Sequence, residues 1–252
     1  MSEPDASDAD MYHPLRMGLA PVSMDNWLKP RPGDEALLAK RKALAETKPA
    51  DVLALQPAAT LAIAELAEHI ARRGFTGVKP GSDLATLASL AESVAEDLCI
   101  LTPHGGSYLF TAGVLCFPNR WRLTDKIGKT LIETHAPVPE YAEAVGATVD
   151  RFLARLRPLR LYMRENWGLA STPELHLPTP VAPVNPATNT DFYLRIETQG
   201  FLKLPTTLAV VFSIRTTVTR WAEVAHERRS AILSAIGKLS TPWMDYKSIK
   251  GP

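Results

Sequence analysis

His135 is the residue whose type and setting best suit metal chemistry. It follows a short amphipathic stretch, residues 125–131, and is followed by Pro137 and Pro139. Each proline fixes its own φ near −65° and pushes the preceding residue toward extended geometry, so the spacing predicts that His135 leaves a helical turn into a stiff loop. A neutral imidazole held there can bind a metal, or a haem iron, through one ring nitrogen while the other is hydrogen-bonded. From spacing alone, a histidine that merely packs at a loop is the alternative.

A second candidate site is a polar strand face made by Tyr193, Arg195, Glu197 and Gln199, which alternate with apolar residues. Inside a pocket that excludes water, the glutamate could bind a cationic amine and the arginine could stabilise reduced oxygen. Two further arginines, Arg164 and Arg215, lie in neighbouring predicted strands and could point to the same region. An ordinary solvated face of an antiparallel sheet fits the alternation equally well.

Basic side chains flank the histidine stretch at Arg120, Arg122, Lys126 and Lys129. They could pair with the carboxylates of a bound cofactor, or they could form the solvated face of a helix.

Composition excludes several classes of protein. The 28 basic and 27 acidic residues give a net charge of +1, which does not favour a nucleic-acid partner. Two cysteines, Cys99 and Cys116, are too few for an iron–sulfur cluster or an all-cysteine zinc site. The acidic N-terminus is unlike an export signal and no apolar run would span a bilayer, so we expect a cytoplasmic protein with reduced thiols and no membrane partner. No P-loop, GxGxxG, HExxH or GxSxG motif occurs.

The elements that must position these residues follow from periodicity and from Pro and Gly breaks. Helices are predicted at 35–46, 60–73, 81–97, 139–157 and 218–236. Strands are predicted at 98–102, 108–117, 159–167, 191–199 and 208–215, with a long loop at 171–190. Strands without regular βαβ alternation favour an α+β fold on an antiparallel sheet. We expect a disordered tail at 1–12, one domain over 13–240 and a loosely ordered tail at 241–252.

Several short segments together resemble the α subunit of haem-dependent oxidative N-demethylase, a family long described only as a domain of unknown function. The matching segments, in the family's order over about residues 12 to 220, are RMGL at 16–19, WL at 27–28, EDL at 96–98, FPNRW at 117–121, KIG at 126–128, IETHAPVP at 132–139, RENW at 164–167, LRIETQ at 194–199, LKLPT at 202–206 and VFSIR at 211–215.

The resemblance implies a haem-binding, PAS-like domain: a central antiparallel sheet with flanking helices and an N-terminal helical region. It implies haem b as cofactor, and a monooxygenase that turns a small methylated secondary amine such as dimethylamine, with O₂, into a primary amine and formaldehyde. It also implies electrons from a separate flavin and iron–sulfur reductase subunit, and a folate-binding subunit that collects formaldehyde.

Carried over by position, His135 corresponds to the haem iron ligand. Glu197, Arg195 and Arg215 correspond to the polar pocket for O₂ and the amine. The cofactor's carboxylates are assigned to a basic set of three side chains: Lys126, Arg122 and Arg164. A haem-binding PAS-like sensor or carrier without catalysis, and a scaffold that has lost haem, remain alternatives.

Overall fold

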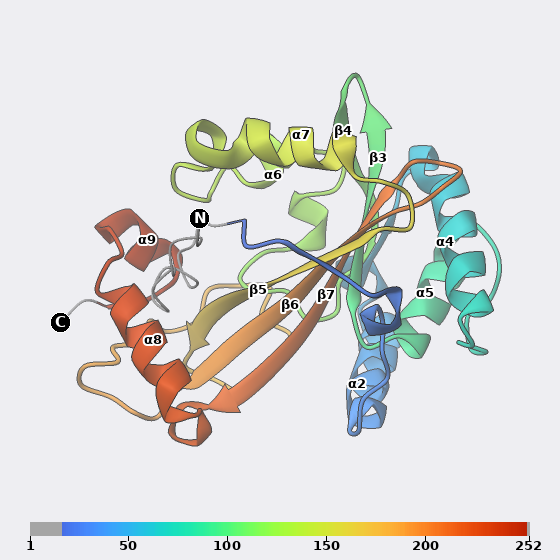
Figure 1. Cartoon of the computed structure of the whole chain (residues 1–252). Coiled ribbons are helices and arrows are strands. Elements are labelled where there is room, and N and C mark those ends of the chain that lie inside the picture. The colour runs from blue at the N-terminus through green and yellow to red at the C-terminus, as the bar shows by residue number, and fades with distance from the viewer. Residues whose placement is uncertain (1–16, 251–252) are drawn as a thin grey trace.

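A computed structural model describes residues 17–250, and its centre is a seven-stranded antiparallel sheet (Figure 1). The strand order is β1-β5-β6-β7-β3-β4-β2. The strands are β1 (Ala20–Val22), β2 (Leu53–Leu55), β3 (Asp97–His104), β4 (Ser107–Val114), β5 (Leu161–Ala170), β6 (Tyr193–Lys203) and β7 (Val210–Arg220). The expected α+β fold, with a central antiparallel sheet and flanking helices, is confirmed.

Local sequence explains the tight hairpin between β3 and β4. Strands β3 and β4 are joined by Gly105 and Gly106, which both have positive φ, at 55° and 85°. Two successive left-handed residues make the tight turn that suits the twist of paired strands, and glycine adopts them at least cost. Strands β5, β6 and β7 follow one another as neighbours, with the long predicted loop, 171–190, between the first two.

One face of the sheet is covered by the N-terminal helical region and by α8 (Figure 1). Helices α2 (Asp34–Thr47), α3 (Pro49–Val52), α4 (Thr60–Arg72) and α5 (Leu84–Ser93) enclose the largest apolar core. Strand residues Leu161, Leu202 and Val211 contribute to this core. Further along the same face, Trp167 and Ile196 pack against α8 (His226–Ile236).

The opposite face is covered by short helices from the middle of the chain. These are α6 (Leu131–Thr134), a wider helical turn at Ala142–Gly146, and α7 (Ala147–Arg155). Leu153 of α7 packs with Phe110, while Phe201 and Phe212 on this face are only partly buried. The polar strand face of β6 lies on this side, because its residues share the pleat with Phe201.

Several element boundaries differ from the predictions. The helix expected at 218–236 begins only at His226, because the β-branched run Thr216–Thr219 extends β7 beside β6. Helix α5 ends at Ser93, and the predicted last residue, Asp97, opens β3 instead.

The end of the chain also differs from the expected loose tail. Residues Thr241–Tyr246 form α9, and Trp243, Lys247 and Ile249 are buried. The single buried tryptophan anchors a segment too short and too polar to be recognised by periodicity. The expected tail at 1–12 and residues 251–252 lie outside the described part of the chain.

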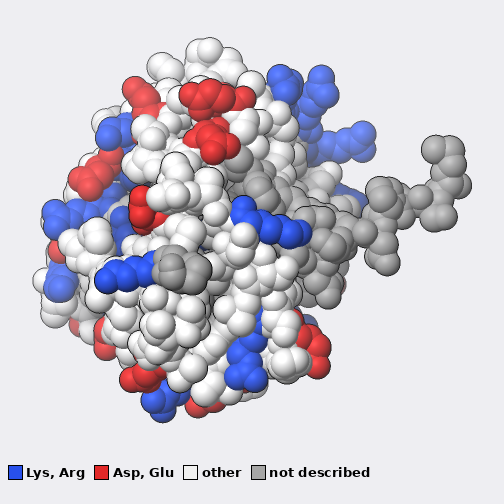
Figure 2. Space-filling model, turned by 90° about the vertical axis from the view of Figure 1, so that its left-hand side faces the viewer, with Lys and Arg blue, Asp and Glu red and all other residues white. Residues whose placement is uncertain are grey.

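Surface charge agrees with the near-neutral composition. Figure 2 shows basic and acidic side chains interspersed among uncharged ones over the face it presents. Between residues 17 and 250, no helix has the length and apolar character needed to cross a membrane.

Candidate functional site

His135 ends a helix of a single turn, as the two following prolines predicted. Thr130 caps α6 at its N-terminus, and the Glu133 carboxylate in turn accepts a hydrogen bond from the Thr130 backbone N–H at 2.8 Å. This reciprocal capping box fixes a helix that would be too short to persist alone. His135 is the C-cap, with φ −99° and ψ 10°, so its own backbone is not extended.

The imidazole of His135 is oriented by two neighbours. Its Nδ1 lies 2.8 Å from the Leu131 carbonyl, which can only accept, so Nδ1 carries the proton and Nε2 keeps its lone pair. The ring stacks on Tyr141, with centroids 4.2 Å apart and planes 12° apart. Among residues 17–250, Nε2 has no hydrogen-bond partner. This is the arrangement of a metal-binding histidine whose second nitrogen is fixed by a backbone carbonyl.

Burial keeps this imidazole neutral. The pKa of His135 is lowered, chiefly by burial, although the hydrogen bond to Leu131 opposes the shift. The positive charges of Lys126 and Arg164 lower the pKa of the ring further. Lys126 Nζ donates to the Thr134 carbonyl, next to the histidine. A neutral imidazole is the form that binds metals, so the environment favours that role at pH 7.

Glu197 lies on the sheet face that α6 and α7 cover. Its Oε2 accepts hydrogen bonds from Gln199 Nε2 at 2.9 Å and from Asn166 Nδ2 at 3.3 Å. Both amides are on the same face as Glu197, since Asn166 pairs directly with it across β5 and β6. Within the described chain Oε1 accepts no hydrogen bond. The carboxylate is therefore oriented through one oxygen and can accept a ligand's N–H through the other.

Positive side chains surround this single carboxylate. Burial lowers the pKa of Arg120, Arg164 and Lys247, and the negative charge of Glu197 opposes the shift for each. Arg120 Nη1 and Arg164 Nε are buried without a hydrogen-bond partner among residues 17–250. Buried cations that outnumber their counter-ions favour an anionic ligand, because an unpaired buried charge is costly.

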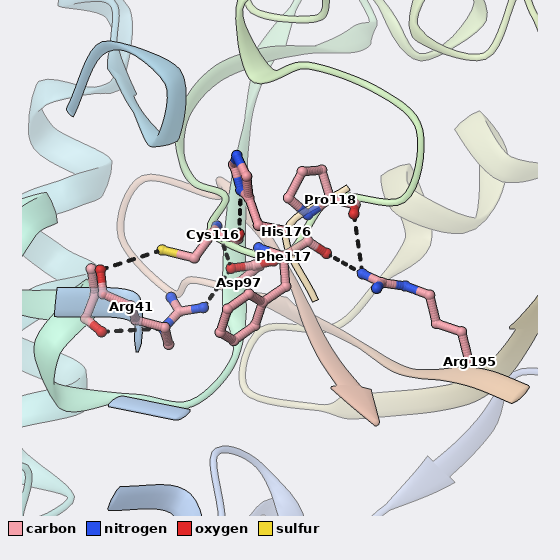
Figure 3. Close-up of polar contacts among 8 residues, drawn as sticks. Arg41, Asp97, Cys116, Phe117, Pro118, His176 and Arg195 are labelled. Atoms are coloured by element: carbon pink, nitrogen blue, oxygen red, sulfur yellow. Dashed lines mark hydrogen bonds and ion pairs between the residues drawn. The ribbon is translucent and has the colours of Figure 1, made fainter. Parts of the chain in front are cut away.

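Arg195 is on the predicted face, but its two Nη groups already donate to backbone carbonyls, and only Nε has no partner among residues 17–250. Nη2 donates to the carbonyls of Phe117 at 2.6 Å and Pro118 at 3.1 Å (Figure 3). Nη1 donates to the Leu175 carbonyl at 3.0 Å. The side chain is only 1% exposed. Arg195 therefore joins the chain after β4 to the loop after β5, and its Nη donors are unavailable to O₂.

The same chain segment is held from its other side. Asp97 accepts from the backbone N–H groups of Cys116 at 2.7 Å and Phe117 at 2.9 Å, and it pairs with Arg41. His176 Nδ1 lies 2.8 Å from the Cys116 carbonyl (Figure 3). Three elements far apart in sequence thus fix residues 116–118, from which the chain runs on to His135.

The prediction for Arg215 is wrong. Arg215 pairs with Thr198, so it lies on the opposite face of the sheet from Glu197. There its guanidinium forms ion pairs with Asp34 of α2 and Glu96. Alternation within one strand could not reveal this, because strand register decides which residues of β7 share a face with Glu197.

The basic residues expected to bind a cofactor separate into two groups. Lys126 and Arg164 lie beside His135. Arg122 is exposed and, within the described chain, has no hydrogen bond or ion pair with the other candidates.

Burial raises the pKa of Cys116 to about 12 and that of Cys99 well above its usual value, so neither thiol is a nucleophile.

Sequence reasoning missed Tyr246 and Lys247, which reach the site from α9. Burial raises the pKa of Tyr246. The negative charge of Glu197 raises this pKa further, and the positive charge of Arg120 opposes the shift. Lys247 Nζ donates to the Trp167 carbonyl at 2.8 Å and lies 4.3 Å from the centre of that indole. No local pattern marks these residues, since only the docking of α9 brings them near Glu197.

Lys247 predicts a specific pH dependence of stability. Its pKa is lowered to about 7, chiefly by burial and by Arg120, with Glu197 opposing. Unfolded lysine titrates near 10.4. Between these values the unfolded chain binds a proton that the folded chain lacks, so the free energy of unfolding rises with pH. From pH 7 to 8.5 we expect a rise of about 1–2 kcal/mol that Lys247→Met lacks.

Urea unfolding of both proteins at the two pH values measures this difference, and every other titrating group cancels in the comparison. An identical pH dependence in wild type and Lys247→Met would contradict a depressed lysine pKa.

A separate hollow of about 580 Å³ is lined by Pro183, Thr241, Met244, Asp245, Ser248, Ile249 and Lys250. It includes none of the predicted site residues.

Within residues 17–250, no group of three or more His, Cys, Asp or Glu side chains could hold a metal ion.

Comparison with known protein families identifies a match. The family model described as haem-dependent oxidative N-demethylase, alpha subunit-like, matches residues 74–251, more than half of the chain. These residues include the whole of the candidate site. No curated protein matches.

Proposed function

Since the chain belongs to the haem-dependent oxidative N-demethylase, alpha subunit-like family, we propose that it binds haem b through His135 and oxidises a small methylated amine with O₂. The observation that carries the proposal is the His135 imidazole: Nδ1 is fixed by Leu131, and the unprotonated Nε2 remains available. A haem iron needs one such ligand from the protein, because the porphyrin supplies four nitrogens.

Residues on the covered sheet face and near His135 suit the other parts of a haem. Haem has a wide apolar ring, and partly buried aromatic side chains lie between α7 and the sheet: Phe152, Tyr162, Phe201 and Phe212. Haem also carries two propionates, and the buried guanidinium of Arg164, with Lys126 beside the histidine, supplies positive charge for them. Arg122 is exposed, so we give it no part in this binding.

The side chains on the sheet face would bind and orient the amine. Bound haem would supply the iron at which O₂ reacts. Glu197 would pair with the ammonium of the substrate through Oε1, while Gln199 and Asn166 hold Oε2. The pairing would place the N-methyl group at a fixed position, and the partial burial of Glu197 would strengthen it.

The chemistry requires an electron donor. Dimethylamine, O₂, two electrons and two protons balance methylamine, formaldehyde and water. The family's description as alpha subunit-like implies further subunits. We propose that a flavin and iron–sulfur reductase supplies the electrons in the cytoplasm and that a folate-binding subunit accepts the formaldehyde.

Glu197→Gln tests the assignment of the substrate site. We expect amine-dependent O₂ consumption, measured with haem and an artificial electron donor, to fall at least about tenfold, because a charge-assisted hydrogen bond is lost. The haem absorption spectrum should not change. The matched control is Glu165→Gln, which removes an exposed carboxylate of β5 that pairs with Arg228.

The same measurements separate the alternatives. Haem binding without turnover of any methylated amine would favour a sensor or carrier. The absence of a Soret band that shifts on reduction would favour a scaffold that has lost haem. Equal loss in Glu197→Gln and Glu165→Gln would remove Glu197 from the site.

A further inference from the structure

Neither of the two arginines expected to act beside Glu197 has an unpartnered Nη group there. Both Nη groups of Arg195 donate hydrogen bonds to backbone carbonyls. Arg215 lies on the other face, paired with Asp34 and Glu96. Among residues 17–250, three guanidinium groups on the covered face keep a buried N–H without a partner: Arg164 and Arg195 at Nε, and Arg120 at Nη1. Arg120 is the one of the three whose unpartnered donor is a terminal Nη group. Arg164 is the one beside His135.

Arg120 has a backbone conformation that its side chain does not favour. Its φ is +63°, in the left-handed region that residues with a Cβ rarely adopt. The surroundings impose it: Arg120 N donates to Leu177 O at 2.6 Å, and Leu177 N donates back to Pro118 O. Arg195 Nη2 also donates a hydrogen bond to this Pro118 carbonyl. An unfavourable conformation that persists because neighbours enforce it is common at functional sites.

The guanidinium of Arg120 lies over a gap in the sheet surface. A Cβ built at Gly168 would be 4.0 Å from Arg120 Nη2. Gly168 pairs with Arg195, one step along the same face from the pair formed by Asn166 and Glu197. Arg120 is therefore next to Glu197 along β5 and β6. Tyr246 and Glu197 both raise the pKa of Arg120, against the effect of burial.

We infer that Arg120 is the guanidinium that acts together with Glu197, and that its Nη1 donates to a small anionic ligand bound beside that carboxylate. This assignment rests on the proposed haem site, and it deepens that proposal by pairing Glu197, the acceptor of the ammonium, with a donor to developing negative charge. A charge-assisted guanidinium hydrogen bond in a site that excludes water suits that role.

The test uses Arg120→Gly, because glycine adopts the left-handed backbone without strain. In haem-loaded protein we expect the dissociation constant for azide, an anion, to rise at least about tenfold, the equivalent of about 1.4 kcal/mol. The dissociation constant for carbon monoxide, a neutral ligand, should change less than about twofold, because no charge-assisted hydrogen bond is lost. The unfolding midpoint should stay equal or increase. Arg120→Lys should recover part of the azide affinity, and Arg157→Gln, at an exposed site, should change nothing.

Three outcomes would overturn the assignment. Arg120→Gly that fails to fold, or unfolds at lower denaturant, would show that the side chain is structural. Unchanged azide affinity in Arg120→Gly, with weaker binding in Arg164→Gln, would give the role to Arg164. A wild-type protein without a Soret band would overturn the proposed function itself, and this assignment with it.

Discussion

Replacing Asp97 with alanine is expected to lower the free energy of unfolding by about 3–5 kcal/mol, the usual cost of leaving one member of a buried ion pair alone. Arg41 and Asp97 are 0% and 1% exposed. The carboxylate also accepts two backbone N–H groups, those of Cys116 and Phe117. Alanine would leave all three donors without an acceptor, and each buried amide adds its own desolvation cost.

Chemical denaturation followed by circular dichroism measures this effect. The matched control is Asp191→Ala, which breaks an exposed ion pair with Arg220 and should cost less than about 1 kcal/mol. Arg41→Leu and the double variant complete a cycle that isolates the coupling between the two charges. Similar losses for Asp97→Ala and Asp191→Ala would show that the buried network contributes little.

Asp97→Asn extends this prediction to the candidate site. The amide keeps the shape but loses the charge that faces Arg41, so the segment 116–118 would be held less firmly. Because Arg120 and His135 follow this segment, haem binding, measured through the Soret band, should weaken even in protein that remains folded. The network thus links the core packed against α2 to the site on the opposite face.

Replacing His135 with alanine is expected to weaken haem binding by more than about 10–100-fold, the range reported when only an outer partner of a metal ligand is lost. His176 is also held through Nδ1, by the Cys116 carbonyl at 2.8 Å, so His176→Ala is a needed comparison and should leave haem binding unchanged. Titration with haem, followed through the Soret band of the oxidised and reduced protein, measures the change.

His104→Ala is the matched control, since His104 lies exposed at the end of β3 and should not affect the spectrum. His135→Ala leaves Leu131 and the capping box intact, so α6 should persist and the overall fold should not change. A spectrum unaltered by His135→Ala would place the iron ligand elsewhere, with His176 as the next candidate.

Local features of the structure were predictable because they depend on neighbours in sequence. The two prolines after His135 end α6, and the turn at Gly105 and Gly106 needs glycine. Strict alternation placed Arg195 and Glu197 on one face of β6. Each inference concerns a segment whose geometry is limited by its own backbone.

The composition of the pocket was less predictable because it depends on contacts between distant segments. Arg215 was assigned to the wrong face, since only the register of β6 with β7 decides that it pairs with Thr198. Arg195 was assigned to a ligand, whereas the approach of residues 117–118 and 174–175 makes it a structural donor. Lys247 was assigned to a loose tail, yet burial beside Trp167 gives it a pKa of about 7.

The sequence by itself determined the α+β fold, the family, the position of His135 after a short helix and the alternation that puts Glu197 and Arg195 on one strand face. Tertiary structure alone decided which charges share a buried space. A cation's role depends on which acceptors come within hydrogen-bond distance, and those acceptors lie dozens of residues away in sequence. For the same reason, Arg120 became the partner of Glu197 only once Arg195, Leu177 and Gly168 were in place around it.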